Sequence, residues 1–308
     1  MFHSSWYIAP GIRLKIMIQD LLKRGPVLTD GAWGTELQKL GLAPGEIADY
    51  WNLSHPEKVG LVARSYVEAG SEIILTNTFR ANRVALHGRQ GADEVRDLNR
   101  RGVEISRSAA GAHARVFASI GPSGKLLLAE EVTEQELYEA FAEQANALAD
   151  AAPDAIVIET MSDLSEATIA LDAAKATGLP TIVCMVFDSG RGQDRTLTGV
   201  TPERAARELT ARGADVIGAN CGKGIDGFIG ICQRLHASTD RPIWIKSNAG
   251  LPHTSGDSIV YDMTAEIFAG YVPQLVKAGA SFIGGCCGTD PGFIRAISGQ
   301  LHKLSLAS

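Results

Sequence analysis

The sequence lacks a surplus of basic residues and any long apolar run. Lys and Arg number 29 against 35 Asp and Glu, which gives a formal net charge of −6 at pH 7 with His neutral. Nucleic-acid-binding proteins carry a basic patch, so nucleic acid is not an expected partner. No segment approaches the roughly 20 consecutive apolar residues of a membrane-spanning helix. We therefore expect no membrane partner.

Cysteine is also scarce, with five in 308 residues, and the N-terminus does not resemble an export signal. His3, Arg13 and Lys15 interrupt its apolar residues, and no small-residue cleavage site follows. Unpaired thiols without an export signal favour a reducing cytoplasm, where they serve metals or catalysis more often than disulfides. We predict a cytoplasmic protein with a flexible N-terminal extension at 1–12 and one domain at 13–308.

Short β-rich runs alternate with helical patterns along the whole chain. Four runs share a layout in which a Gly or Pro breaker precedes apolar residues and then a polar one: EAGSEIILTN, AAPDAIVIET, ARGADVIGAN and KAGASFIGGC. Four more lie between them: VLTDG, VFASIGP, TIVCMVF and PIWIKSN. Continuous apolar strands separated by helices indicate a parallel sheet covered by helices.

Eight such units predict the α/β class and a single-domain (β/α)8 TIM barrel. An open doubly wound sheet is the competing topology. It is disfavoured because DGAWG, and not a glycine-rich dinucleotide fingerprint, follows the first strand. Four patterns mark expected helix starts, two as capping boxes and two as caps before proline: Ser54–Glu57, Thr133–Glu136, Thr201–Pro202 and Asp290–Pro291.

Polar residues gather at the C-terminal ends of the predicted strands, which meet at one mouth of a barrel. They are Asp30, Asn77, Glu159, Asn220, Cys221, Asn248, Cys286 and Cys287. Cys221 ends the sixth strand, and the adjacent pair Cys286 and Cys287 ends the eighth. Three thiols at one rim can hold Zn²⁺ and leave a fourth position open, the pattern of a catalytic site.

Adjacent side chains on a strand point to opposite faces, so a neighbouring pair of ligands needs an explanation. The flanking Gly284, Gly285 and Gly288 are expected to allow backbone conformations that turn both sulfurs inward. A disulfide between the pair would be strained, and reducing conditions oppose it. Cysteine also packs as a small hydrophobe. That is the role we expect for Cys184 in the fifth strand and Cys232 in a helix.

No histidine stands at a strand end, and His253, in the loop after the seventh strand, is the nearest candidate. A solvated loop residue is the favoured interpretation of His253. Three thiolates on Zn²⁺ leave a net charge of about −1, which suits deprotonation of a bound thiol better than formation of hydroxide. The resulting thiolate can attack an alkyl group on a positively charged donor.

Six segments together resemble the zinc-dependent homocysteine S-methyltransferases, over residues from about 25 to about 297. The segments are LTDGAWGTEL, TNTFRAN, IVIET, GANCG, KSNAGLP and GGCCG. This family includes the homocysteine-binding module of cobalamin-dependent methionine synthase, betaine–homocysteine methyltransferase and S-methylmethionine-dependent enzymes. The resemblance implies a (β/α)8 barrel with zinc on Cys221, Cys286 and Cys287.

The resemblance also implies that Asp30, with the backbone amides of Gly31 and Ala32, and Glu159 hold the amino-acid end of homocysteine. Carboxylates suit an ammonium group, and backbone N–H groups suit a carboxylate. A turn or helix-cap role remains open for Asp30. Asn248 resembles the asparagine that fills the fourth zinc position in the methionine synthase branch until homocysteine displaces it. A plain hydrogen-bonding role for Asn248 is equally open.

The implied enzyme transfers a methyl group from a small donor, such as S-methylmethionine or betaine, to the zinc-activated thiolate of homocysteine, forming methionine. The chain is expected to lack the folate, cobalamin and reactivation modules of methionine synthase and the C-terminal arm of the betaine enzyme. The alternative is a homocysteine-binding component that takes methyl groups from a separate corrinoid protein. A non-catalytic barrel with a structural metal is disfavoured, because structural zinc sites have four ligands.

Overall fold

Eight parallel strands form one sheet that closes on itself. The computed structural model describes residues 17–255 and 258–306, so the extension expected at 1–12 lies outside the described residues. The sheet runs in the order β1-β10-β7-β6-β5-β4-β3-β2, and a parallel bridge between Thr29 and Ile73 joins its two edges. The strands are β1 Val27–Leu28, β2 Ile73–Ile74, β3 Arg115–Ile120, β4 Ala155–Met161, β5 Thr181–Met185, β6 Val216–Gly224, β7 Ile243–Asn248 and β10 Ala280–Gly285.

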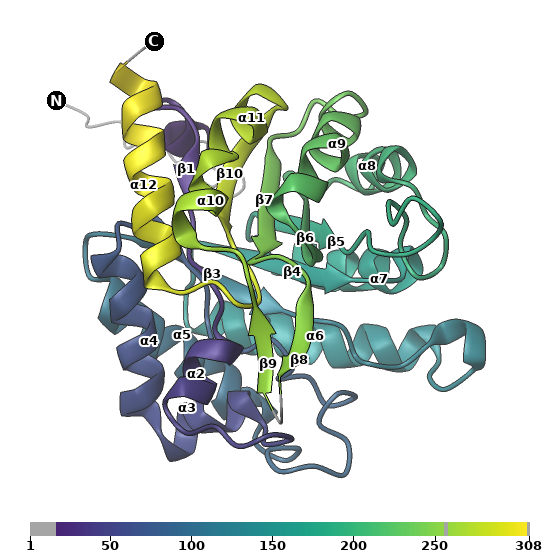
Figure 1. Cartoon of the computed structure of the whole chain (residues 1–308). Coiled ribbons are helices and arrows are strands. Elements are labelled where there is room, and N and C mark those ends of the chain that lie inside the picture. Colours follow the sequence, from purple (N-terminus) through teal and green to yellow (C-terminus); the bar gives the residue numbers. More distant parts are fainter. Residues whose placement is uncertain (1–16, 256–257, 307–308) are drawn as a thin grey trace, which may run out of the picture.

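Helices follow each strand and cover the outside of the sheet (Figure 1). They are α2 Gly34–Lys39, α3 Trp51–Ser54, α4 Pro56–Glu68, α5 Val95–Ala110, α6 Glu134–Asp150, α7 Leu164–Lys175, α8 Pro202–Ala211, α9 Ile225–His236, α10 Ala265–Gly270, α11 Val272–Lys277 and α12 Pro291–Leu306, with 3-10 turns η1 Ala48–Tyr50 and η2 Leu127–Ala129. The predicted (β/α)8 barrel is confirmed. In the described ranges no helix combines the length and the apolar character that crossing a bilayer requires.

The inside of the barrel is filled by side chains from alternate positions of the strands. On β7, Trp244 belongs to the interior cluster, whereas Ile243 and Ile245 belong to the cluster that includes the helices. The Trp244 ring lies 6.0 Å from that of Phe117 and 5.2 Å from that of Phe282, measured between centroids. A closed apolar filling of this kind leaves polar side chains only at the ends of the strands.

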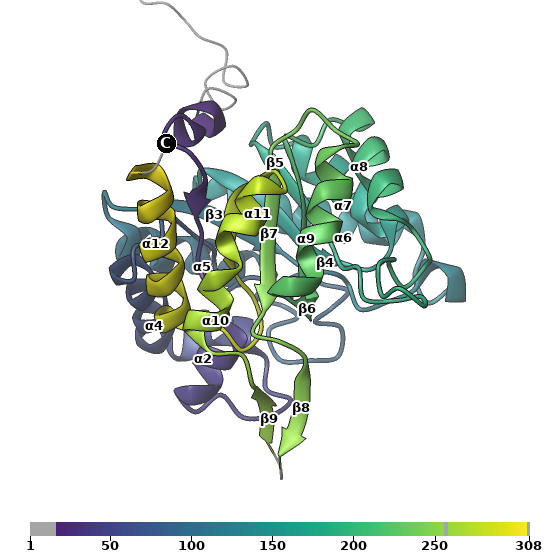
Figure 2. The ribbon, with the colours of Figure 1, turned by 45° about the horizontal axis from the view of Figure 1, so that its top comes forward.

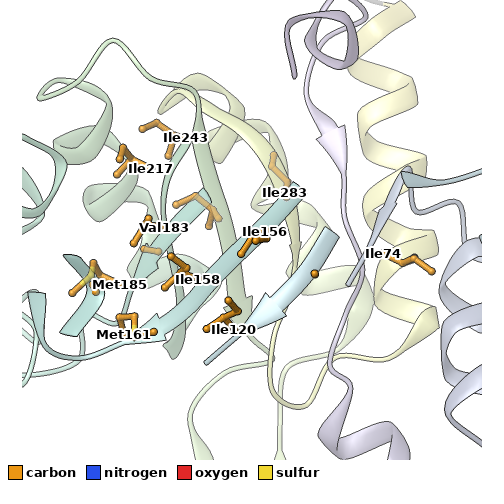
Figure 3. Close-up of a cluster of buried hydrophobic side chains, with 14 of the residues drawn as sticks. Ile74, Ile120, Ile156, Ile158, Met161, Val183, Met185, Ile217, Ile243 and Ile283 are labelled. Carbon is orange, nitrogen blue, oxygen red and sulfur yellow. The ribbon is translucent and has the colours of Figure 1, made fainter. Parts of the chain in front are cut away.

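The outer faces of the strands supply the larger core, part of which Figure 3 shows as side chains from β2 to β7 and β10. Ile156 and Ile158 of β4 and Val183 of β5 are fully buried in this cluster with residues of the covering helices. Burial on both faces explains why these strands are apolar at nearly every position.

Three of the four predicted helix starts are confirmed. Thr133 and Glu136 form both bonds of a capping box before α6, and Thr201 accepts a bond from the backbone N–H of Arg204 before α8. Asp290 accepts from Gly292 N at 2.8 Å. The capping box at Ser54 is wrong. Ser54 is the last residue of α3, and its hydroxyl donates to Tyr50 O, so His55 stands at the cap position of α4.

An antiparallel hairpin follows β7, where the sequence indicated a loop. It consists of β8 Pro252–Ser255 and β9 Ser258–Tyr261. In both views the hairpin extends from the barrel at the end where α2 lies, while α12 runs to the opposite end (Figures 1 and 2). The hairpin therefore marks the mouth at the carboxyl ends of the strands.

Candidate metal centre and amino-acid pocket

Three cysteines meet at the mouth, from the ends of β6 and β10. The sulfur atoms of Cys221, Cys286 and Cys287 all lie within 4.8 Å of one another. Those of Cys221 and Cys287 are 3.9 Å apart. All three side chains are partly exposed. No other group of three or more His, Cys, Asp or Glu side chains comes together in this way within 17–255 and 258–306. The three thiols can hold a metal ion.

Backbone geometry, and not glycine alone, brings the sulfurs together. Cys221 itself has a φ of +62°, in the left-handed region, and Gly288 has a φ of +81°. Gly284 and Gly285 do not have positive φ, contrary to their expected role. They are required because a Cβ at Gly284 would lie 2.0 Å from Thr29 Oγ1, and one at Gly285 2.2 Å from Thr289 Oγ1. Close packing against Thr29, which follows β1, and against Thr289 explains these two glycines.

Gly288→Ala is expected to lower the free energy of unfolding by about 2–5 kcal/mol. The left-handed backbone costs roughly 1–2 kcal/mol for a residue with a Cβ. That Cβ would lie 2.3 Å from Cγ of Tyr261, and overpacking adds about 1–3 kcal/mol. Urea denaturation measures the change. The control is Gly299→Ala in α12, where a Cβ meets nothing within 4 Å, and we expect a gain of about 0.5–1 kcal/mol. Equal behaviour of the two variants would contradict the packing argument.

The three thiols interact electrostatically as one group. Hydrogen bonds from Cys286 and Cys287, together with one from Asn248, lower the pKa of the Cys221 thiol to about 3. The hydrogen bond with Cys221 raises the pKa of Cys287 to about 12, and it also raises the pKa of Cys286. The cluster therefore stabilises a thiolate at Cys221.

Asn248 lies beside this cluster at the end of β7. Its side chain is buried and forms a hydrogen bond with Cys221. Its Oδ1 atom is buried and finds no hydrogen-bond partner among the described residues. Three sulfurs and one amide oxygen fit the four-coordinate, thiolate-rich site that zinc favours. His253 is not part of the cluster. It lies in β8, exposed, with Nδ1 at 3.3 Å from Asp262 Oδ2.

Glu159 lies near the C-terminal end of β4, with its carboxylate buried inside the mouth. Ser119 Oγ donates to its Oε1 at 2.6 Å, and Asn220 Nδ2 donates to its Oε2 at 3.3 Å. Burial raises the pKa of Glu159, and the nearby Lys246 ammonium and the Ser119 hydroxyl offset this only in part. Asn220 Nδ2 also lies 3.8 Å from the sulfur of Cys286. The carboxylate and the sulfur cluster are therefore neighbours.

Asp30 is fully buried and already has several donors in the protein. Lys246 Nζ lies 2.5 Å from Oδ1, while Trp33 Nε1 and Leu75 N each donate to Oδ2 at 2.7 Å. Burial alone would lower the pKa of Lys246, but the carboxylates of Asp30 and Glu159 raise it above its ordinary value.

Lys246 is a residue of this pocket that the sequence analysis did not identify. The available signal was its position two residues after Trp244, which places it on the interior face of β7.

The backbone at Gly31 and Ala32 continues from Asp30 and is also buried. Ala32 N donates to Thr289 Oγ1 at 3.2 Å, so this amide has a partner in the protein. Gly285 N donates to the carbonyl oxygen of Asp30 at 3.0 Å. These bonds fix Asp30 next to the segment that carries the paired cysteines.

Asn77 lies at the mouth, but its side chain forms hydrogen bonds with the neighbouring segment between β1 and α4. Its Nδ2 donates to Ala48 O at 2.7 Å and to Asn52 Oδ1 at 3.1 Å. The hydroxyls of Thr76 and Thr78 bond to each other, and Thr76 also accepts from Ser119 N. These residues support β3 and, through Ser119, Glu159.

Residues 27–301 match the profile of the homocysteine S-methyltransferase family. The chain belongs to this family. The enzyme class expected from the sequence is thereby confirmed. Methionine synthases of Mycobacterium leprae and Mycobacterium tuberculosis are each 29% identical over 92% of the chain, which spans about a quarter of their length. The metallated form of the Escherichia coli homocysteine methyltransferase MmuM has the same fold, with a TM-score of 0.76 at 23% identity over 95% of this chain and 100% of that one.

Proposed function

We propose that the protein is a zinc-dependent methyltransferase that moves a methyl group from a small donor to the sulfur of homocysteine, giving methionine. The observation that carries this proposal is the placement of three converging thiols beside a buried carboxylate in a family of homocysteine S-methyltransferases. The metallated form of MmuM adds support for a metal at this fold. A cytoplasmic location is part of the proposal, because a working site needs reduced thiols.

Cys221, Cys286 and Cys287 would hold the zinc, and Asn248 Oδ1 would be the ligand that the substrate displaces. The ion supplies a lowered thiol pKa, so that homocysteine is a thiolate at neutral pH. The unpartnered oxygen of Asn248 supports this role, since a buried acceptor without a donor is costly unless it binds a ligand. Asn220 donates toward Cys286 and thereby orients one of the sulfurs.

Asp30, Gly31, Ala32 and Glu159 form the pocket proposed for the amino-acid end of homocysteine. Ser119 and Asn220 fix the orientation of the Glu159 carboxylate through one oxygen each. A carboxylate held in this way can accept a charge-assisted hydrogen bond from an ammonium group without reorganising. The substrate would thus be held at both ends, with its sulfur at the cysteines.

A second candidate follows from the relatives named methionine synthase, of which the chain spans about a quarter. The barrel would then be the homocysteine-binding part of a system that takes methyl groups from a separate corrinoid protein. The chemistry at the cysteines is the same in both cases. Only the methyl donor differs.

A donor panel tests the proposal. Zinc-loaded protein is incubated with homocysteine and, separately, S-methylmethionine, betaine or a methylated corrinoid, and methionine is measured. We expect methionine from S-methylmethionine or betaine without any added protein. Methionine from the corrinoid alone would favour the second candidate, and no methionine from any donor would contradict both. Selenohomocysteine and simple thiols as acceptors test whether homocysteine is the true substrate.

A further inference from the structure

A buried ion pair lies at the base of the proposed amino-acid pocket. The Asp30 and Lys246 side chains are 0% and 3% exposed, and Lys246 Nζ is 2.5 Å from Asp30 Oδ1. The other oxygen of Asp30 accepts from Trp33 and Leu75. Both oxygens of this carboxylate therefore have protein donors, one of them a full positive charge. Such a pair is stable only while both partners remain, because either one alone is an uncompensated buried charge.

Glu159 differs from Asp30 in the donors that it has. Within 17–255 and 258–306, its two oxygens accept only from neutral groups, the Ser119 hydroxyl and the Asn220 amide. Lys246 acts on Glu159 through space, while its one hydrogen-bonded carboxylate among the described residues is Asp30. Asp30 and Lys246 thus pair with each other, and Glu159 is the carboxylate of this group that has no cation at hydrogen-bond distance among the described residues. Glu159 is also the carboxylate joined through Asn220 to the sulfur of Cys286.

We propose that Lys246 is a positioning and specificity-determining residue: it engages Asp30 and leaves Glu159 as the single acceptor for the substrate's ammonium group. Asp30 then acts through Lys246 and does not contact the substrate. This division of roles deepens the proposed function and rests on it. It predicts selection of thiols that carry a primary ammonium group, because only a cation compensates Glu159.

A variant cycle separates this proposal from direct contact by Asp30. In Asp30→Asn, Lys246 loses its partner and is drawn to Glu159, where it competes with the substrate's ammonium. We expect the Kd of homocysteine on the zinc-loaded protein, measured by calorimetry, to rise at least about tenfold. Adding Lys246→Met removes the competing charge and should return the Kd to within about threefold of the parent. Glu159→Gln should weaken binding in both backgrounds.

Other outcomes decide against the proposal. If Asp30 contacts the ammonium, adding Lys246→Met will not rescue Asp30→Asn. If the pair only supports the fold, Asp30→Asn will lower the melting temperature without changing the Kd of the folded protein. Failure of the parent to bind homocysteine overturns the proposed function and the ammonium assignment together. The Asp30–Lys246 pairing is still judged separately, from melting temperatures that fall in each single variant and recover in the double one.

Two matched comparisons complete the experiment. Arg96 and Asp150 form an ion pair of the same 2.5 Å length that is exposed, and Asp150→Asn should change neither the melting temperature nor the Kd. As ligand probes, 3-aminopropanethiol keeps the ammonium and 4-mercaptobutanoate lacks it. We expect the parent to bind the amine at least tenfold more tightly. A preference for the acid would overturn the assignment of Glu159.

Discussion

Replacing any one of Cys221, Cys286 or Cys287 by alanine is expected to remove zinc and to lower kcat by about 10³-fold or more. The substrate thiol has an ordinary pKa of about 8.5, so without the metal little thiolate is present at neutral pH. Two thiols do not replace three, because the sulfurs converge from two strands on one point. Zinc content measured by elemental analysis and methionine formation give the two readouts.

The fold should survive these changes, since the three cysteines are partly exposed and lie outside the two main hydrophobic clusters. Far-ultraviolet circular dichroism and the melting temperature check this. Cys232→Ala is the matched control. Cys232 is buried in α9 with its thiol bonded to Ala278 O, so the variant should keep zinc and turnover. A strand-end cysteine whose alanine variant kept stoichiometric zinc would have to be withdrawn as a ligand.

Glu159→Gln is expected to raise the KM for homocysteine by about 10- to 100-fold with a change in kcat below about threefold. A charge-assisted hydrogen bond contributes roughly 1.5–3 kcal/mol, which corresponds to that range of affinity. The glutamine keeps the size of the side chain but carries no charge to pair with an ammonium group. Steady-state kinetics at saturating methyl donor separate KM from kcat.

Glu166→Gln provides the comparison for this variant. Glu166 is a buried carboxylate at the start of α7 that accepts from Ser123 N at 2.7 Å, so it matches Glu159 in burial but serves the loop after β3. Its replacement should leave KM unchanged. An unaltered KM in Glu159→Gln, or an equal rise in both variants, would argue against an ammonium site at Glu159.

The barrel could be predicted because its strands carry a strong local signal. Successive residues such as Ile156 and Val157 of β4 point to opposite faces of the sheet and are both apolar and buried, and that pattern occurs where helices cover a parallel sheet. The mouth followed from topology, since every parallel strand of a barrel ends on the same side. The exact ends of helices were harder to predict. Ser54 could not be recognised as the end of α3 because helix boundaries depend on the preceding turn.

The site was predictable in its residue types but not in its pairings. Alternation along β7 gives the face on which Lys246 lies, yet only the assembled barrel shows that Asp30, 216 positions away in sequence, is its partner. The glycines before the paired cysteines were expected for their backbone freedom, whereas close contact with Thr29 and Thr289 is what requires them. Contacts between distant strands are set by tertiary packing and leave no local trace in the sequence.

The side-chain amide of Asn220 donates hydrogen bonds to Glu159, Thr160 and Cys286. It therefore connects the buried carboxylate with the sulfur cluster. A displacement of Glu159 or of Cys286 therefore changes the hydrogen bonds of the same Asn220 side chain. The binding free energies measured separately for the sulfur end and for the amino-acid end of a ligand should then not add up to the binding free energy of the complete ligand, because groups that share a partner are energetically coupled.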